Sequence, residues 1–117
     1  MSWDFQTDRP IYLQIMEHFE AGILSGEYPA GSRLKSVRDL AAEAAVNPNT
    51  MQKALAELER KGLVHSCRTS GRHITDDESV IQKLRTEQAG EKTRLFLKQM
   101  YQMGFQKEDL LHLIQEL

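Results

Sequence analysis

The segment from residue 48 to residue 61 carries hydrogen-bonding side chains at helical spacing. Wound as an α-helix, it places Asn49, Gln52, Lys53 and Ala56 on the side opposite its leucines. Asparagine and glutamine can form paired hydrogen bonds with adenine, lysine can reach guanine or a phosphate, and a small alanine lets a base edge approach closely. These residue types indicate a surface that reads DNA, although an ordinary solvated helix face has a similar composition.

The start of this segment is suited to bind phosphate. Pro48 fits the first position of a helix, with Asn47 as its N-cap. Asn49 and Thr50 then lie in the first turn, where backbone N–H groups and the helix dipole favour an anion. The first turn therefore supplies further candidate DNA contacts.

A shorter helix is predicted before this one. Ser36 is a good N-cap, and Asp39 completes a Ser-x-x-Asp capping box. Proline disfavours the α conformation in the residue before it, so the shorter helix must end by Asn47. Each helix has one apolar stripe to bury, and two short helices joined by a tight turn match the helix-turn-helix unit. The stripes consist of Val37, Leu40, Ala41 and Ala44 in the first helix, and of Met51, Ala54, Leu55 and Leu58 in the second.

A β-hairpin is predicted directly after this pair of helices. Residues 63–67 alternate as a strand, residues 68–71 form a turn and residues 72–75 return as the second strand. A hairpin in this position is a wing, and Arg68 and Arg72 at its tip suit backbone phosphates or a minor groove. The alternative is a hairpin whose charges only keep an exposed edge soluble.

Charge is distributed unevenly along the 117 residues, although the formal net charge is only −2. Residues 1–32 have five acids and one arginine, a net charge of −4, whereas residues 33–72 have eight bases and four acids, a net charge of +4. Positive charge therefore gathers around the helix-turn-helix and the wing, as expected for a surface that faces DNA.

The end of the chain is rich in apolar residues. A pattern that starts near Val80 leads into a dense apolar run over residues 95–103, and we expect one long helix or two nearly collinear ones, with Gly90 as the weak point. A last helix is expected over residues 107–117. These helices must be covered either by the first helix of the chain or by a second copy, and an apolar surface of this size favours the second copy. The residues expected at this homodimer contact are Leu84, Leu95, Phe96, Met100, Tyr101, Met103, Leu110, Leu113 and Ile114.

Several classes of function have little support. Cys67 is the single cysteine, which excludes an intramolecular disulfide and a zinc site of several cysteines. We interpret Cys67 as a packing residue in its strand and not as a nucleophile. The alternative is a redox sensor, which needs an exposed, electropositive setting, and Arg68 is the only hint of one. No glycine-rich phosphate loop or paired histidine motif is present, so we expect no catalytic residue, no metal and no cofactor. No apolar run reaches membrane-spanning length and the first residues do not resemble a secretory signal, which predicts no membrane partner and a cytoplasmic location.

The predicted fold is mainly α with a small β-hairpin (α+β). A helix opens at Pro10, with Asp8 or Arg9 as its cap, and ends at Gly26. Residues 33–34 are a very short strand before the helix-turn-helix. We expect two domains, a winged helix-turn-helix DNA-binding domain over residues 1–75 and a two-helix dimerisation or effector tail over residues 76–117.

The sequence resembles the GntR family of bacterial transcription regulators. The resemblance rests on RPIYLQI in the first helix, on GSRLKSVRDLAAEAAVNPNTMQKALAELERKGLV across the centre, and on the short tail, which is similar to the YtrA subfamily. It implies a dimer that binds a palindromic double-stranded DNA operator and represses a transporter or efflux operon. By resemblance the DNA contacts include Arg38, Asn47 and Gly71, in addition to Asn49, Thr50, Gln52 and Lys53.

The chain departs from the family pattern at three places. Ala45 stands in the turn where the family commonly has glycine, and a left-handed alanine there would cost about 1 kcal/mol. Lys35 replaces a frequent proline. In the wing, the first glycine of the usual motif is lost and His73 takes the place of the inward-facing aromatic.

Two questions stay open at this stage. A winged helix can also serve as a protein-interaction module without specific DNA binding, and this is the alternative function. The signal that releases DNA is either a small-molecule effector, bound at the dimer interface among Phe96, Tyr101 and the methionines, or protein concentration acting through dimerisation.

Overall fold

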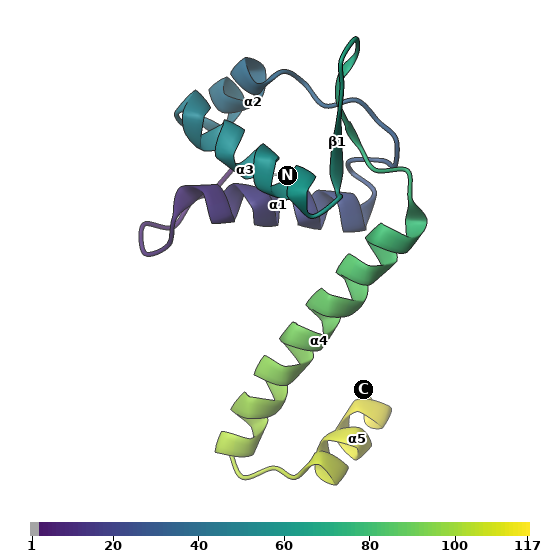
Figure 1. The fold of residues 1–117 in the computed structure, drawn as a ribbon. Coiled ribbons are helices and arrows are strands. Elements are labelled where there is room, and N and C mark those ends of the chain that lie inside the picture. Colours follow the sequence, from purple (N-terminus) through teal and green to yellow (C-terminus); the bar gives the residue numbers. More distant parts are fainter. Residues whose placement is uncertain (1–2) are drawn as a thin grey trace. The chain divides into compact units, whose positions relative to one another are not determined.

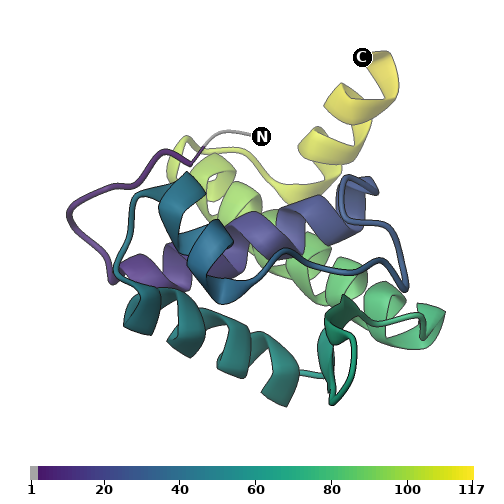
Figure 2. The same ribbon diagram turned by 90° about the horizontal axis from the view of Figure 1, so that it is seen from above.

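The computed structural model describes residues 3–117 (Figures 1 and 2). The chain divides into two compact units, one that runs up to Leu84 and one over Arg85–Leu117, so the division falls inside a helix. The elements in order are α1 (Ile11–Ser25), α2 (Val37–Ala44), α3 (Pro48–Arg60), β1 (Val64–Cys67), β2 (Gly71–Ile74), α4 (Glu78–Gln102) and α5 (Lys107–Glu116). This order confirms the predicted α+β winged helix-turn-helix.

Helix α1 begins at Ile11, with Pro10 itself as the N-cap residue, so the expected cap at Asp8 or Arg9 is wrong by one position or more. Proline can occupy this boundary because the first amides of a helix have no intrahelical acceptor. Gly26 ends the helix in the left-handed conformation with φ 86°, as predicted. Before the helix, Trp3 lies flat on His18, with ring centroids 3.6 Å apart.

The helix-turn-helix has the predicted caps. The Ser36 hydroxyl accepts a hydrogen bond from the Asp39 amide at 3.1 Å, and the Asn47 side-chain oxygen accepts one from the Asn49 amide at 2.7 Å. Pro48 is in the first turn of α3. Between the helices, Ala45 is left-handed with φ 56° and ψ 46°. Because no other non-glycine residue among those described has a positive φ, this alanine is the strained point of the turn.

One hydrophobic core joins α1, α2, α3, the wing and the start of α4. Phe19 of α1 and Leu55 of α3 have no exposed surface, and α1 and α3 lie against each other (Figure 2). Burial of such side chains stabilises the folded chain by roughly 1.5–3 kcal/mol each. Both stripes expected for the helix-turn-helix face this core. The fully or nearly fully buried members are Ile15, Phe19, Ile23, Leu40, Ala41, Ala44, Met51, Ala54, Leu55, Leu58, Leu63, Val64, Ile74, Ile81 and Leu84.

The wing is an antiparallel hairpin in which Val64 pairs with Ile74 and Cys67 pairs with Gly71. Arg33 forms an isolated antiparallel bridge with His73, so the expected short strand before α2 is reduced to one bridging residue beside the two-stranded wing. Its neighbours complete the ladder, because the Leu34 amide donates to the Arg72 carbonyl at 2.9 Å. Gly71 belongs to β2 and not to the turn, which therefore spans residues 68–70.

The second unit contains most of α4 and all of α5. Helix α4 is continuous from Glu78 to Gln102, so Gly90 does not divide it. Gly104, with φ 93°, follows it. The Gln106 amide donates to the Asp109 carboxylate at 2.8 Å at the start of α5. Within residues 3–117, no helix is both long enough and apolar enough to cross a membrane.

Candidate nucleic-acid interface

Helix α3 presents the predicted polar face. Asn49, Gln52 and Lys53 are exposed and Thr50 is half-buried, while the opposite face of the helix packs on α1 and α2. Asn47 is exposed too, but its side-chain oxygen already caps α3, so its amide group is what remains for a partner. The structure therefore places four of these candidates in the first half of α3 and Asn47 at its N-cap, on a helix whose opposite face packs in the core.

Lys53 has a partner that the sequence interpretation did not assign. Its ammonium lies 4.0 Å from the centroid of the Tyr12 ring, which belongs to α1. A cation over an aromatic face is attracted by about 0.5–1 kcal/mol at an exposed site. Tyr12 thus restricts the positions of the lysine. No local signal in the sequence indicates a contact between two residues that are 41 positions apart.

Arg38 lies in the first turn of α2 and is exposed, as the resemblance implied. Within residues 3–117 it forms no ion pair. Other cations of the basic segment are neutralised locally, since Lys35 pairs with Glu43 at 2.7 Å. Arg60 likewise pairs with Glu57 at 2.7 Å. The free positive charge is therefore concentrated at Arg38, on α3 and in the wing, which sharpens the field available to a polyanion.

The wing residues have three different environments. Arg68 is exposed in the turn. Gly71 is left-handed with φ 82° and lies beneath the Arg33 guanidinium, which would be 3.7 Å from a Cβ at this position. Arg72 is half-buried, and its Nε atom has no hydrogen-bond partner among the described residues. The two arginines are thus not equivalent, because Arg68 is presented to solvent and Arg72 is built into the wing.

Glu59 fastens the wing to α3. Its carboxylate accepts a hydrogen bond from the Ser66 amide at 2.8 Å. This hydrogen bond, together with the charges of Arg72 and His65, lowers the pKa of Glu59 below its ordinary value. The sequence interpretation treated Glu59 only as one of four acids in the basic segment. The contact fixes the position of β1 relative to the helix that carries the polar face.

The interpretation of Cys67 as a packing residue is wrong. Its side chain is exposed, because in this short hairpin only Val64 of β1 is buried. Hydrogen bonds from Ser70 and Thr69 stabilise the thiolate and lower the pKa of Cys67 to about 7. His73 is half-buried, and its Nε2 lies 2.9 Å from the Ser70 hydroxyl.

Two of the residues expected at a dimer contact are buried within the chain itself. Leu84 is 5% exposed and packs in the core of the first unit, and Leu110 is 2% exposed. Both are corrected to packing residues, because helical periodicity shows which face is apolar but not what covers it. The others are exposed or half-buried, and Leu111, absent from the expected set, is exposed as well. The exposed members are Leu95, Phe96, Tyr101, Met103, Leu113 and Ile114, while Met100 is half-buried.

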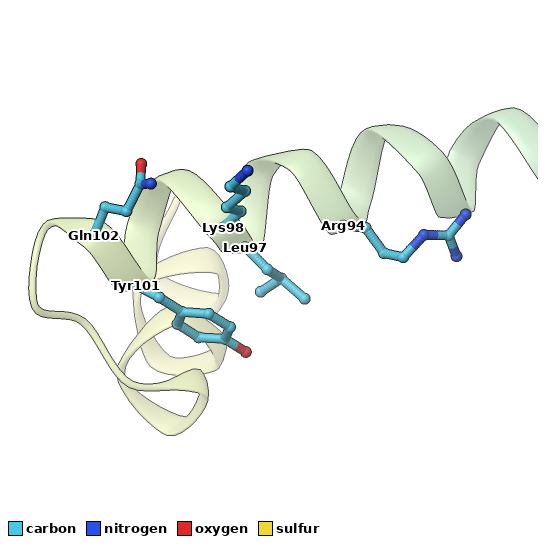
Figure 3. Close-up of a pocket in the computed structure, with 5 residues that line it drawn as sticks. All are labelled: Arg94, Leu97, Lys98, Tyr101 and Gln102. Atoms are coloured by element: carbon cyan, nitrogen blue, oxygen red, sulfur yellow. The ribbon is translucent and has the colours of Figure 1, made fainter.

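A groove runs along the second half of α4 (Figure 3). Its volume is about 450 Å³, and Arg94, Leu97, Lys98, Tyr101 and Gln102 line it. Figure 3 shows Leu97 and Tyr101 on one side of the helix and Lys98 and Gln102 on another. Tyr101 is the one residue of the expected effector site that lines it, and Phe96 does not. The described residues contain no group of three histidine, cysteine or acidic side chains that could hold a metal ion.

The arrangement of α1, the helix-turn-helix and the wing has a match among known families. The profile of the bacterial regulatory proteins of the gntR family matches residues 11–74, which extend from the start of α1 to the end of β2. The chain belongs to the GntR family.

Relatives extend the match to the tail of this GntR protein. It is 36% identical to YhcF of Bacillus subtilis, an uncharacterized HTH-type transcriptional regulator, over 95% of this chain and 92% of that protein. A solved GntR family transcriptional regulator from Listeria monocytogenes has 35% identity and a TM-score of 0.88, covering 97% of this chain and 99% of that one. The protein is accordingly a transcriptional regulator with a winged helix-turn-helix domain, and not an enzyme.

Two further matches bear on the subfamily and on the fold of the first unit. The HTH-type transcriptional repressor YtrA of Bacillus subtilis is 39% identical over 63% of this chain and 57% of that protein, which supports the YtrA subfamily. The DNA-binding domain of AraR, solved in complex with operator ORX1, matches with a TM-score of 0.57 and 23% identity, over 62% of this chain and 93% of that one. The likeness to AraR concerns the fold alone.

Proposed function

We propose that this GntR protein is a dimeric repressor of a transporter-type operon that binds a palindromic operator. The polar face of α3 reads base edges in the major groove, and Arg38, Arg68, Gly71 and Arg72 contact the DNA backbone or the minor groove. Two-fold related copies place their α3 helices in successive major grooves, so operator symmetry mirrors protein symmetry.

The exposed polar face of α3 is the observation that carries this proposal. Asn49, Gln52 and Lys53 are exposed, and so is Arg38. Three of the four acids of the basic segment, Glu43, Glu57 and Glu59, bind local partners. A solvated face of a structural helix does not require basic side chains to be kept apart from acidic ones, because scattered charges of both signs keep it soluble. The cation–π contact also holds Lys53 in a limited set of positions, which favours recognition over simple solvation.

The test is DNA binding measured by fluorescence anisotropy with palindromes from the promoter of the chain's own operon. Lys53→Ala should weaken binding to the preferred palindrome by about ten-fold or more, since a good base contact is worth roughly 1–3 kcal/mol. Lys83→Ala removes an exposed lysine of α4 and is the matched control. Normal binding by Lys53→Ala would refute this reading face. Failure of the unaltered chain to bind any duplex at low salt would favour the protein-interaction module instead.

The proposed dimer contact uses the exposed apolar residues of the second unit. Leu95 of α4 is 58% exposed and Ile114 of α5 is 55% exposed. Exposed apolar surface of this extent usually marks an interface with a partner. Ile114→Asp should convert the dimer to a monomer in sedimentation equilibrium, because a desolvated carboxylate would face the partner. Gln115→Asp adds the same charge at an exposed polar neighbour and should leave the dimer intact. A dimer that survives Ile114→Asp would place the contact elsewhere.

A further inference from the structure

A cleft lies between the beginning of α2 and the wing. Its volume is about 380 Å³, enough for a phosphodiester group with part of its sugar. Arg33, Lys35 and Arg72 line it together with the backbone at Ser36 and Val37, and we call it the wing cleft. It belongs wholly to the first unit. The predicted DNA contacts include Arg72, but neither Arg33 nor the cleft as a site.

Three basic side chains and the Cys67 thiol are the ionisable groups that line the wing cleft. None of its lining residues is acidic. Among the described residues, Lys35 forms an ion pair with Glu43 at 2.7 Å, whereas Arg33 and Arg72 form no ion pair. Arg72 lines the cleft with a half-buried side chain, and its Nε atom has no hydrogen-bond partner among the described residues. The first amides of α2 add to this, because the opening N–H groups of a helix lack intrahelical acceptors.

Arg33 is held in place from two directions. Its backbone forms an isolated bridge with His73, and the adjacent Leu34 amide donates to the Arg72 carbonyl at 2.9 Å, so the backbone of the arginine is tied to β2. Its guanidinium lies beside Gly71, with Nε 3.7 Å from the position that a Cβ would take there. A guanidinium whose backbone is already fixed loses less conformational entropy when it binds a tetrahedral anion.

We infer that the wing cleft binds one phosphate of the DNA backbone, with Arg33 and Arg72 as its ligands. This inference rests on the proposed function, since it assumes that α3 and the wing both face DNA. The cleft lies between the elements expected in the major groove and at the adjacent minor groove, where a duplex presents its backbone. Contacts of this kind set register and orientation and carry no base preference.

The inference is tested with Arg33→Gln, in anisotropy titrations over a range of salt concentrations. Affinity should fall by about ten-fold on the palindrome and on an unrelated duplex alike, and the salt slope should fall by about one. Arg33→Lys retains the charge and should retain the slope, while Lys83→Gln is the control for a distant cation. Circular dichroism checks the fold of each variant. If Arg33→Lys reduces the salt dependence of binding as much as Arg33→Gln does, the wing is damaged in both variants and the inference is overturned.

Duplexes with single methylphosphonate linkages give the second arm. One neutral linkage should weaken the unaltered chain and leave Arg33→Gln with no further loss, because the same contact is removed twice. If the loss of affinity from each neutral linkage adds to the loss from Arg33→Gln, the inference is overturned. Orthophosphate that raises the melting temperature of the unaltered chain but not of Arg33→Gln, with a flat linkage scan, would assign the cleft to a free anion. If the unaltered chain binds duplex and Arg33→Gln binds equally well, the inference fails and the proposed function stands.

Discussion

Ala45→Gly should stabilise the protein, although glycine usually destabilises. The alanine is left-handed, which costs an L-residue roughly 1–2 kcal/mol, and glycine adopts this conformation freely. Glycine also raises the conformational entropy of the unfolded chain, which lowers the free energy of unfolding by about 0.4–1 kcal/mol. The Ala45 side chain is exposed, so little burial is lost, and its amide keeps the hydrogen bonds to Ala41 and Ala42. The expected net gain is about 0.5–1 kcal/mol, or roughly 2–8 °C in melting temperature for a domain of this size.

Urea denaturation followed by circular dichroism measures this gain. Ala42→Gly makes the same chemical change three residues earlier, at an exposed position inside α2, and should destabilise by about 1 kcal/mol. The two substitutions should therefore change the free energy of unfolding in opposite directions. The dependence of that free energy on urea concentration should be similar in both variants. Equal destabilisation by both would refute the argument that backbone strain is stored at the turn. DNA affinity should not change, because Ala45 lies outside the polar face of α3.

Two other predictions concern the wing. Glu59→Gln should lower stability at neutral pH, and because the pKa of Glu59 is lowered in the folded state, the stabilisation is present above its ordinary value and is lost as pH falls through the folded pKa. Urea midpoints of the two proteins should therefore converge in acid, and a constant gap would contradict this assignment. Cys67 should react with iodoacetamide at a half-maximal rate near pH 7, and Ser70→Ala should move that midpoint upward. An unchanged profile in Ser70→Ala would show that the hydroxyl does not stabilise the thiolate.

Local chemistry made much of the fold predictable. The caps at Ser36 and Asn47 and the proline at position 48 are short-range signals, and the structure has all three. The exposed α3 face follows from helical periodicity, because the apolar stripe opposite to it must be buried. The left-handed Ala45 was indicated by the family pattern and confirmed by its φ angle.

Contacts between distant elements were beyond this reasoning. Periodicity placed Leu84 and Leu110 on apolar faces, but whether a face meets its own chain or another depends on tertiary packing. The exposure of Cys67 was missed for a similar reason, since strand alternation defines two sides and not which of them is covered. The position of Arg33 beside Gly71 arises from its bridge to His73, a residue 40 positions further along the chain. No local pattern reports such a pairing.

The contact between Lys53 and Tyr12 has a consequence for changing operator preference. A library that varies only the residues proposed to face DNA would keep Tyr12. Every new side chain at position 53 would then have to pack beside an aromatic ring that favours a cation. Substitutions at position 12 should alter the spectrum of accepted residues at position 53 without any contact with a base. Experiments that redesign or diversify this regulator would therefore vary the two positions jointly, because under the proposed function the half-buried Tyr12 helps to set what position 53 can present to DNA.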